Sequence, residues 1–150
     1  VLAYLGGIHY WWSKMTGRMY SEFWGKISAM LVFVGFNLTF FPQFILGYMG
    51  MPRRYASYPE EFQVLNIFST AGASVLGVGL LLPAIYLTYS CFAGAKAGDN
   101  PWLLPGLEWR TSSPPPTENF TDTPIVTWEA YDFGEESGLG TGEPKEVYTV

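Results

Sequence analysis

The sequence predicts an all-α membrane protein with an extended acidic tail, and three observations carry this prediction. No charged side chain occurs between Ile27 and Met49 or between Phe62 and Ala95, and each run exceeds the roughly 20 residues that cross a bilayer as a helix. Only 14% of the 150 residues are charged while 49% are hydrophobic, whereas soluble domains average about 25% charged residues. After Phe92, ten acidic residues accompany three basic ones, so this part carries about −7 and the preceding part about +2.

The first 26 residues predict a truncated helix and a basic loop. Residues 1–12 are apolar and aromatic but too few to span a bilayer, so we expect the end of a transmembrane helix and a chain that is the C-terminal piece of a longer polypeptide. Residues 13–26 contain three basic side chains and one acidic side chain. Short basic loops favour the cytoplasmic side of a membrane, so this loop is predicted to be cytoplasmic.

The rest of the chain predicts a helical hairpin and a tail. Residues 27–49 and 62–92 are predicted transmembrane helices, and residues 50–61 are the predicted outer loop. Residues 93–150 are the predicted cytoplasmic tail, rich in proline, glycine and acidic residues. We expect this tail to be docked up to about Phe120, because it contains several tryptophans and leucines, and to be loosely held after Gly134.

Two local patterns concern the second span. Ser57 and Glu60 have the spacing of a capping box, which predicts that the helix starts there. Ser69, Ala73 and Gly77 place small residues at every fourth position, which favours close packing of another helix against this face.

Few residues could ligate a metal. The lone His9 and the lone Cys91 exclude a histidine-rich or cysteine-rich metal site within this chain. Any metal would need ligands from elsewhere, and neither residue is assigned a role.

Arg53 and Arg54 form a cation pair between the two predicted spans, where basic residues of translocated loops are usually scarce. One explanation is contact with lipid headgroups at the membrane surface. The other is a buried dianionic ligand, because a guanidinium group meets a carboxylate or phosphate with two parallel hydrogen bonds. Composition alone leaves both explanations open.

Longer motifs favour the second explanation. The region around the arginine pair closely resembles the eleventh transmembrane helix and following loop of subunit I of the haem-copper cytochrome c oxidases, through Phe33-Val34-Gly35-Phe36-Asn37-Leu38-Thr39-Phe40-Phe41-Pro42-Gln43 and Gly50-Met51-Pro52-Arg53-Arg54-Tyr55. Residues before and after it are similar to the family's tenth and twelfth helices and to the C-terminal extension of bacterial members, through Gly6-Gly7, Trp11, Tyr58-Pro59, Asn100-Pro101-Trp102, Leu107-Glu108-Trp109 and Thr111-Ser112-Ser113-Pro114-Pro115-Pro116.

The resemblance implies that the chain is the C-terminal part of a twelve-helix bundle. This bundle would be the catalytic subunit of a terminal respiratory oxidase that reduces dioxygen to water with electrons from cytochrome c and pumps protons. The complete subunit would contain a low-spin haem, a high-spin haem and copper. The implied partners are the rest of subunit I, subunits II and III, cytochrome c and membrane lipid, with no nucleic acid. The implied location is the bacterial cytoplasmic membrane.

The resemblance also assigns site residues. Arg53 and Arg54 match the family's arginine pair, which binds haem propionates on the outer face, and Phe40 and Gln43 match positions beside the low-spin haem. The family's metal ligands lie upstream of this sequence, and His9 does not match them, so no metal-binding or catalytic residue is expected here.

Two alternatives remain at this point. A quinol oxidase of the same superfamily shares the fold and the arginines but takes electrons from a membrane quinol. A non-catalytic two-span membrane scaffold would need neither haem nor copper.

Overall fold

The computed structural model describes residues 1–104, 106–120 and 122–126, and within these residues the regular elements are helical. The long helices are α1 (Leu2–Thr16), α2 (Glu22–Tyr48) and α3 (Gln63–Ala93). Two short 3₁₀ turns cover Glu60–Phe62 and Leu107–Trp109. The chain forms two compact units. We call residues 21–89 the helical hairpin, and residues 1–20 together with the chain from Ser90 onward the tail unit.

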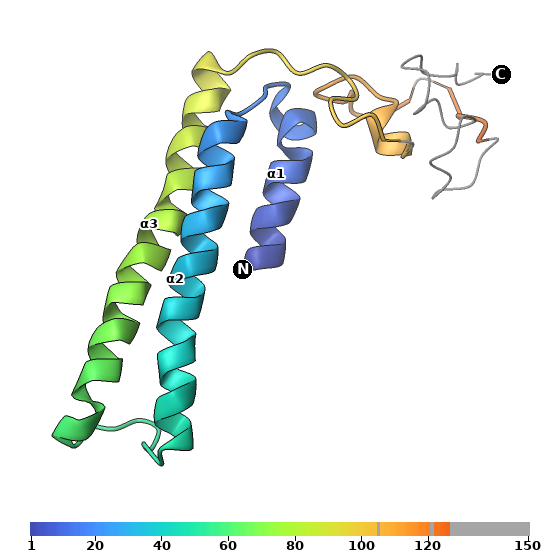
Figure 1. Cartoon of the computed structure of the whole chain (residues 1–150). Coiled ribbons are helices and arrows are strands. Elements are labelled where there is room, and N and C mark those ends of the chain that lie inside the picture. Colours follow the sequence, from blue (N-terminus) through green and yellow to red (C-terminus); the bar gives the residue numbers. More distant parts are fainter. Residues whose placement is uncertain (105, 121, 127–150) are drawn as a thin grey trace. The chain divides into compact units, whose positions relative to one another are not determined.

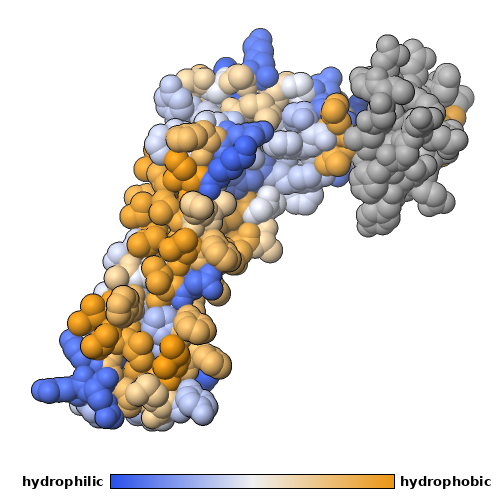
Figure 2. All heavy atoms as spheres, viewed as in Figure 1, coloured by the Kyte–Doolittle hydropathy of each residue, from blue (hydrophilic) through white to orange (hydrophobic). Residues whose placement is uncertain are grey.

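In the helical hairpin, α2 and α3 lie side by side and run antiparallel (Figure 1). Both are long and apolar enough to cross a membrane, as predicted from their composition. Figure 2 shows apolar side chains over the middle of the hairpin and hydrophilic ones at its loop end. The helix α2 begins at Glu22, within the predicted loop 13–26, and a Glu22–Lys26 ion pair of 3.0 Å spans its first turn, where such pairs support a helix beyond its apolar run.

The two helices meet along a seam of small and polar residues. The buried residues of α2 alternate three and four positions apart if the half-buried Thr39 is included, and they are Ser28, Val32, Gly35, Pro42 and Leu46. A spacing of 3.5 residues is typical of helices that pack nearly parallel over a long distance. On α3, the matching positions include the buried Asn66, Ser69, Gly72 and Gly79.

This spacing corrects the predicted packing face. Ser69 does lie at the seam, where its Oγ donates a 2.9 Å hydrogen bond to the carbonyl of Thr39. Gly77 does not, because a Cβ added there would meet nothing within 4 Å. Gly72 takes its place, and a Cβ there would lie 2.5 Å from the carbonyl carbon of Leu38. Small residues at every fourth position predict the wrong stripe, because the buried positions Ser69, Gly72 and Gly79 of α3 are three and seven residues apart.

The predicted capping box at the start of α3 is also wrong. The 3₁₀ turn follows Pro59 without a side-chain cap, and α3 itself begins at Gln63. Phe62, which is 6% exposed, packs instead in an apolar cluster with Leu46 and Met51. Burial of this phenylalanine, and not a side-chain cap, therefore marks where the chain enters the helix.

In the tail unit, α1 ends at Gly17, whose φ of +68° suits glycine at a helix C-terminus. A Cβ at this position would also lie 2.8 Å from the Cδ of Pro114. The backbone just beyond it pairs with the segment after α3, since the Met19 amide donates to Ala95 at 2.8 Å and the Ala97 amide donates to Gly17 at 2.9 Å. Gly17 therefore allows two distant segments to meet.

The residues after α3 pack against α1 through one buried tryptophan and one buried lysine. Trp109 is 1% exposed and its Nε1 donates a 3.0 Å hydrogen bond to the Tyr10 hydroxyl. Lys14 is 6% exposed, and its Nζ donates to the carbonyls of Asp99 at 2.8 Å, Thr111 at 2.7 Å and Ser112 at 3.4 Å. The expectation of a loosely held end at residues 134–150 lies outside the described residues.

Candidate functional site

The loop between α2 and α3 carries the arginine pair in a defined backbone conformation. Gly50 has a φ of +92° and Arg54 a φ of +55°, a region that residues other than glycine seldom adopt. Met51, between these two residues, is fixed in place on the end of α2. Its amide donates a 3.0 Å hydrogen bond to the Leu46 carbonyl, and its side chain is buried beside Leu46. The loop is therefore anchored directly before the arginines.

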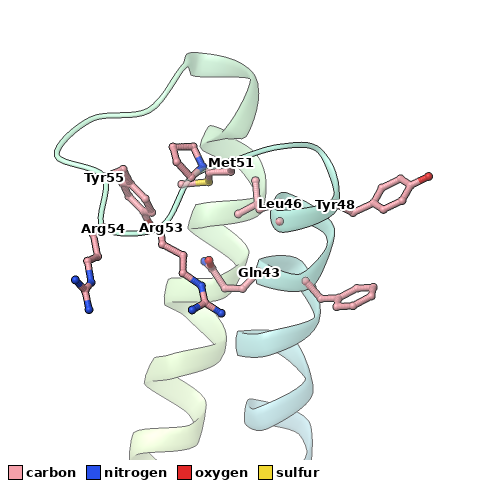
Figure 3. Close-up of a pocket in the computed structure, with 10 residues that line it drawn as sticks. Gln43, Leu46, Tyr48, Met51, Arg53, Arg54 and Tyr55 are labelled. Carbon is pink, nitrogen blue, oxygen red and sulfur yellow. The ribbon is translucent and has the colours of Figure 1, made fainter.

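A pocket of about 560 Å³ lies between the last turns of α2 and this loop. Its lining combines apolar and aromatic side chains with two cations, and the lining residues are Gln43, Phe44, Leu46, Gly47, Tyr48, Met51, Pro52, Arg53, Arg54 and Tyr55. Figure 3 shows the side chains of Arg53 and Arg54 extending from the loop back along the helices, whereas Tyr48 points away from them. Both guanidinium groups therefore point along the hairpin and not beyond its end.

The two arginines of this pocket form no ion pair within 4.0 Å in the described part of the chain, although Glu60 and Glu61 lie further along the same loop. Neither Arg53 nor Arg54 makes an ion pair or hydrogen bond to any described residue, and both side chains are exposed. Two guanidinium groups beside apolar walls can bind a ligand that has an apolar body and two acidic groups. Within residues 1–104, 106–120 and 122–126, no cluster of His, Cys, Asp or Glu could hold a metal ion.

The structure brings together three of the four residues singled out from the sequence. Arg53, Arg54 and Gln43 all line the pocket. Phe40 does not line it; its ring is 51% exposed and packs on Phe36 with ring centroids 4.6 Å apart. Phe40, predicted from the sequence to lie beside the haem, is thus about one turn of α2 away from the pocket.

Sequence reasoning missed the polar residues that support the loop. The Tyr55 hydroxyl and the Gln43 Nε2 both donate to Oδ1 of Asn66, at 3.3 Å and 3.4 Å. Asn66 lies in an uncharged apolar run and is 8% exposed. A polar residue within a membrane span is itself a signal for an internal partner, and this signal could have identified Asn66.

An antiparallel pair of apolar helices, joined by a loop with an arginine pocket, is the architecture of a helical membrane protein. Residues 1–75, half of the chain, match the family described as Cytochrome C and Quinol oxidase polypeptide I. The chain belongs to this family of multi-span helical membrane proteins, which confirms both the predicted fold class and the resemblance seen in the motifs.

Individual relatives extend the similarity into the tail. The chain is 47% identical over 137 residues to cytochrome c oxidase subunit 1 of Synechocystis sp., which covers 91% of this chain and 25% of that protein. It is 46% identical over 126 residues to the haem-copper oxidase subunit I+III of Aeropyrum pernix, which covers 83% of this chain and 15% of that protein. The chain therefore spans about a quarter or less of the length of these relatives, and the first alignment is long enough to include the described tail residues.

Proposed function

We propose that this chain forms part of the catalytic subunit of a terminal respiratory oxidase that reduces dioxygen to water and pumps protons. Family membership and the similarity to proteins named cytochrome c oxidase subunit 1 support this proposal. The observation that carries it is the pocket with two exposed arginines that form no ion pair with any described residue. A lipid headgroup would need the charges but not the pocket with apolar walls.

The residues of this pocket fit a haem. Arg53 and Arg54 would hold the two propionates, while the exposed rings of Phe44 and Tyr55, which also line the pocket, offer apolar contacts of the kind that a porphyrin edge requires. When bound, the haem supplies reversible one-electron chemistry at its iron. The complete subunit would hold two haems and copper, with all metal ligands outside this chain.

The role of the arginines follows from their charge. A cation close to a haem stabilises the added electron, so the two arginines would raise the reduction potential of the haem. They would also favour the ionised form of the propionates, because an opposite charge nearby favours a carboxylate. Gln43 lies on the same side of the pocket as Arg53 (Figure 3) and would provide a neutral polar contact next to the low-spin haem, with Phe40 one turn away.

We further propose that cytochrome c is the electron donor, that subunits II and III are partners, and that the site lies on the outer face of the bacterial cytoplasmic membrane with the tail inside. The relatives named cytochrome c oxidase subunit 1 support cytochrome c as the electron donor. The relative named subunit I+III supports subunit III as a partner. The family description also includes quinol oxidases, so the donor requires its own test.

The test is to purify the membrane complex that contains this chain and to measure oxygen uptake. We expect uptake with reduced cytochrome c and weak or no uptake with a quinol, together with haem absorbance and one copper-containing partner subunit. Uptake with the quinol alone would favour a quinol oxidase. A complex without haem absorbance would contradict the proposal and favour a non-catalytic scaffold.

A further inference from the structure

One buried amide is bonded to three residues that line the arginine pocket, Gln43, Met51 and Tyr55, and to Phe62 beside them. Asn66 lies in the first turn of α3, and its Nδ2 donates to the Phe62 carbonyl at 2.9 Å and to the Met51 Sδ at 3.8 Å. Its Oδ1 accepts the two bonds from Gln43 and Tyr55 described above. An asparagine side chain has two donor hydrogens and two acceptor sites, so every one of them is used.

The position of these partners matters more than their number. Met51 and Tyr55 directly bracket Pro52, Arg53 and Arg54 in the sequence, and both are bonded to the same amide. Gln43 adds a contact from α2, and Phe62 adds one from the turn before α3. The arginines therefore lie on a five-residue arch whose two ends are bonded to one side chain.

We infer that Asn66 is a positioning residue that holds this arch and thereby sets the direction of both guanidinium groups. The backbone supports this role, because Arg54 has a φ of +55°, and a residue other than glycine keeps such a conformation only where its surroundings hold it. The ordering of the arch is independent of what it binds. Only the consequence for a haem rests on the proposed function.

The chemistry of the site requires a neutral amide. Aspartate at position 66 could still accept from Tyr55 and Gln43, but it would lose both donors and place a negative charge close to the arginines. Leucine has the same number and branching of side-chain heavy atoms, although its methyl groups are bulkier, and it makes none of the four bonds. Asn66→Asp therefore tests the loss of the two donated hydrogen bonds, and Asn66→Leu tests the loss of all four.

The experiment compares backbone amide exchange of residues 50–56 in the intact membrane complex. We expect Asn66→Leu to speed exchange in this segment roughly tenfold, since several hydrogen bonds of ordinary strength are lost, and Asn66→Asp to have a smaller effect. Tyr55→Phe, which removes a single bond at one end of the arch, provides a milder variant if Asn66→Leu fails to assemble. Asn37→Leu is the matched control, because among the described residues Asn37 bonds the Phe33 carbonyl of its own helix and nothing in the loop.

A redox titration of the same complexes completes the test. We expect the haem midpoint of Asn66→Leu to shift in the same direction as that of Arg54→Gln. Unchanged exchange at residues 50–56 in Asn66→Leu and Tyr55→Phe would overturn the positioning role, whatever the arginines bind. Faster exchange with an unchanged midpoint in both Asn66→Leu and Arg54→Gln would support the positioning role and overturn the proposed haem contact.

Discussion

At the scale of single residues, Arg54 is the position where the local cost is most evident. Its left-handed backbone, with φ of +55°, would suit glycine or asparagine better. Glutamine and lysine are unbranched at Cβ, as arginine is, so they bear the same backbone cost. Differences among these three residues therefore report the side chain and not the fold of the loop.

We predict that Arg54→Gln lowers the midpoint potential of the low-spin haem by roughly 20 to 100 mV, the order expected for one unit charge in a medium of effective dielectric constant about 20. Arg54→Lys retains the charge but not the planar group, so it is expected to keep most of the potential. A redox titration of the purified complex measures both. A midpoint for Arg54→Gln equal to that of the unaltered protein would remove this role.

The arginines could be found from the sequence, because two adjacent cations between long apolar runs are conspicuous. Asn66 could be noticed as a polar residue in an apolar run, but its pairing with Tyr55 could not be predicted. Tyr55 and Asn66 are eleven residues apart and on different elements, and no local pattern brings them together. The contact depends on how α3 enters the hairpin, which buried Phe62 determines and the capping pattern misplaces.

At the scale of elements, the hairpin depends on backbone approach at glycines. A Cβ at Gly72 would lie 2.5 Å from the Leu38 carbonyl carbon, and one at Gly79 would lie 2.8 Å from the Val32 amide nitrogen. These neighbours are backbone atoms, which cannot move aside as a flexible side chain can. The two helices would have to separate to admit even a methyl group.

We predict that Gly72→Ala destabilises the assembled protein by about 1 to 3 kcal/mol, the usual cost of forcing extra volume into a packed interface. Gly77→Ala on the same helix is the control, since a Cβ there meets nothing within 4 Å. Thermal unfolding of the two variants in the same detergent gives the comparison. Equal stability of both variants would contradict the assigned seam.

The existence of the two long helices follows from composition, because an uncharged apolar run of this length forms a helix wherever a membrane or a bundle surrounds it. Which face packs on the partner does not follow. Apolar residues lie on all sides of both helices, so an apolar stripe marks no face. The seam is distinguished by its buried small and polar residues, such as Ser28, Asn66 and Gly72, and the regular spacing of Ser69, Ala73 and Gly77 offered a competing pattern.

At the scale of the whole molecule, Lys14 connects α1 to the segment after α3. Burial lowers the pKa of Lys14 from its ordinary 10.5, while the carboxylates of Asp99 and Glu108 oppose this effect. The packed state therefore binds this proton less tightly than the free chain does. The packing of the segment after α3 on α1 should therefore become more stable as pH rises from the lowered pKa to 10.5. Below this pH window, the free-energy cost of burying the charged ammonium group is fully present.

We predict that proteolysis of residues 99–112 slows as pH rises through this window, and that Lys14→Met abolishes the dependence. The matched control is Lys96→Met, since Lys96 is an exposed lysine of the same unit. Cleavage rates in the purified complex, corrected for the activity of the protease at each pH, give the slope. A slope that is the same in Lys14→Met and Lys96→Met would show that another group is responsible.

The three acceptors of Lys14 are all main-chain oxygens, which every amino acid possesses. The hydrogen bonds of this anchor consequently follow the path of the backbone and not the identity of the side chains. Positions 111 and 112 are free to diverge among descendants of this gene as far as the lysine is concerned, whereas the carboxylate of Asp99 also favours its charge. The same ammonium group could fasten tails of quite different composition to an otherwise unchanged helix.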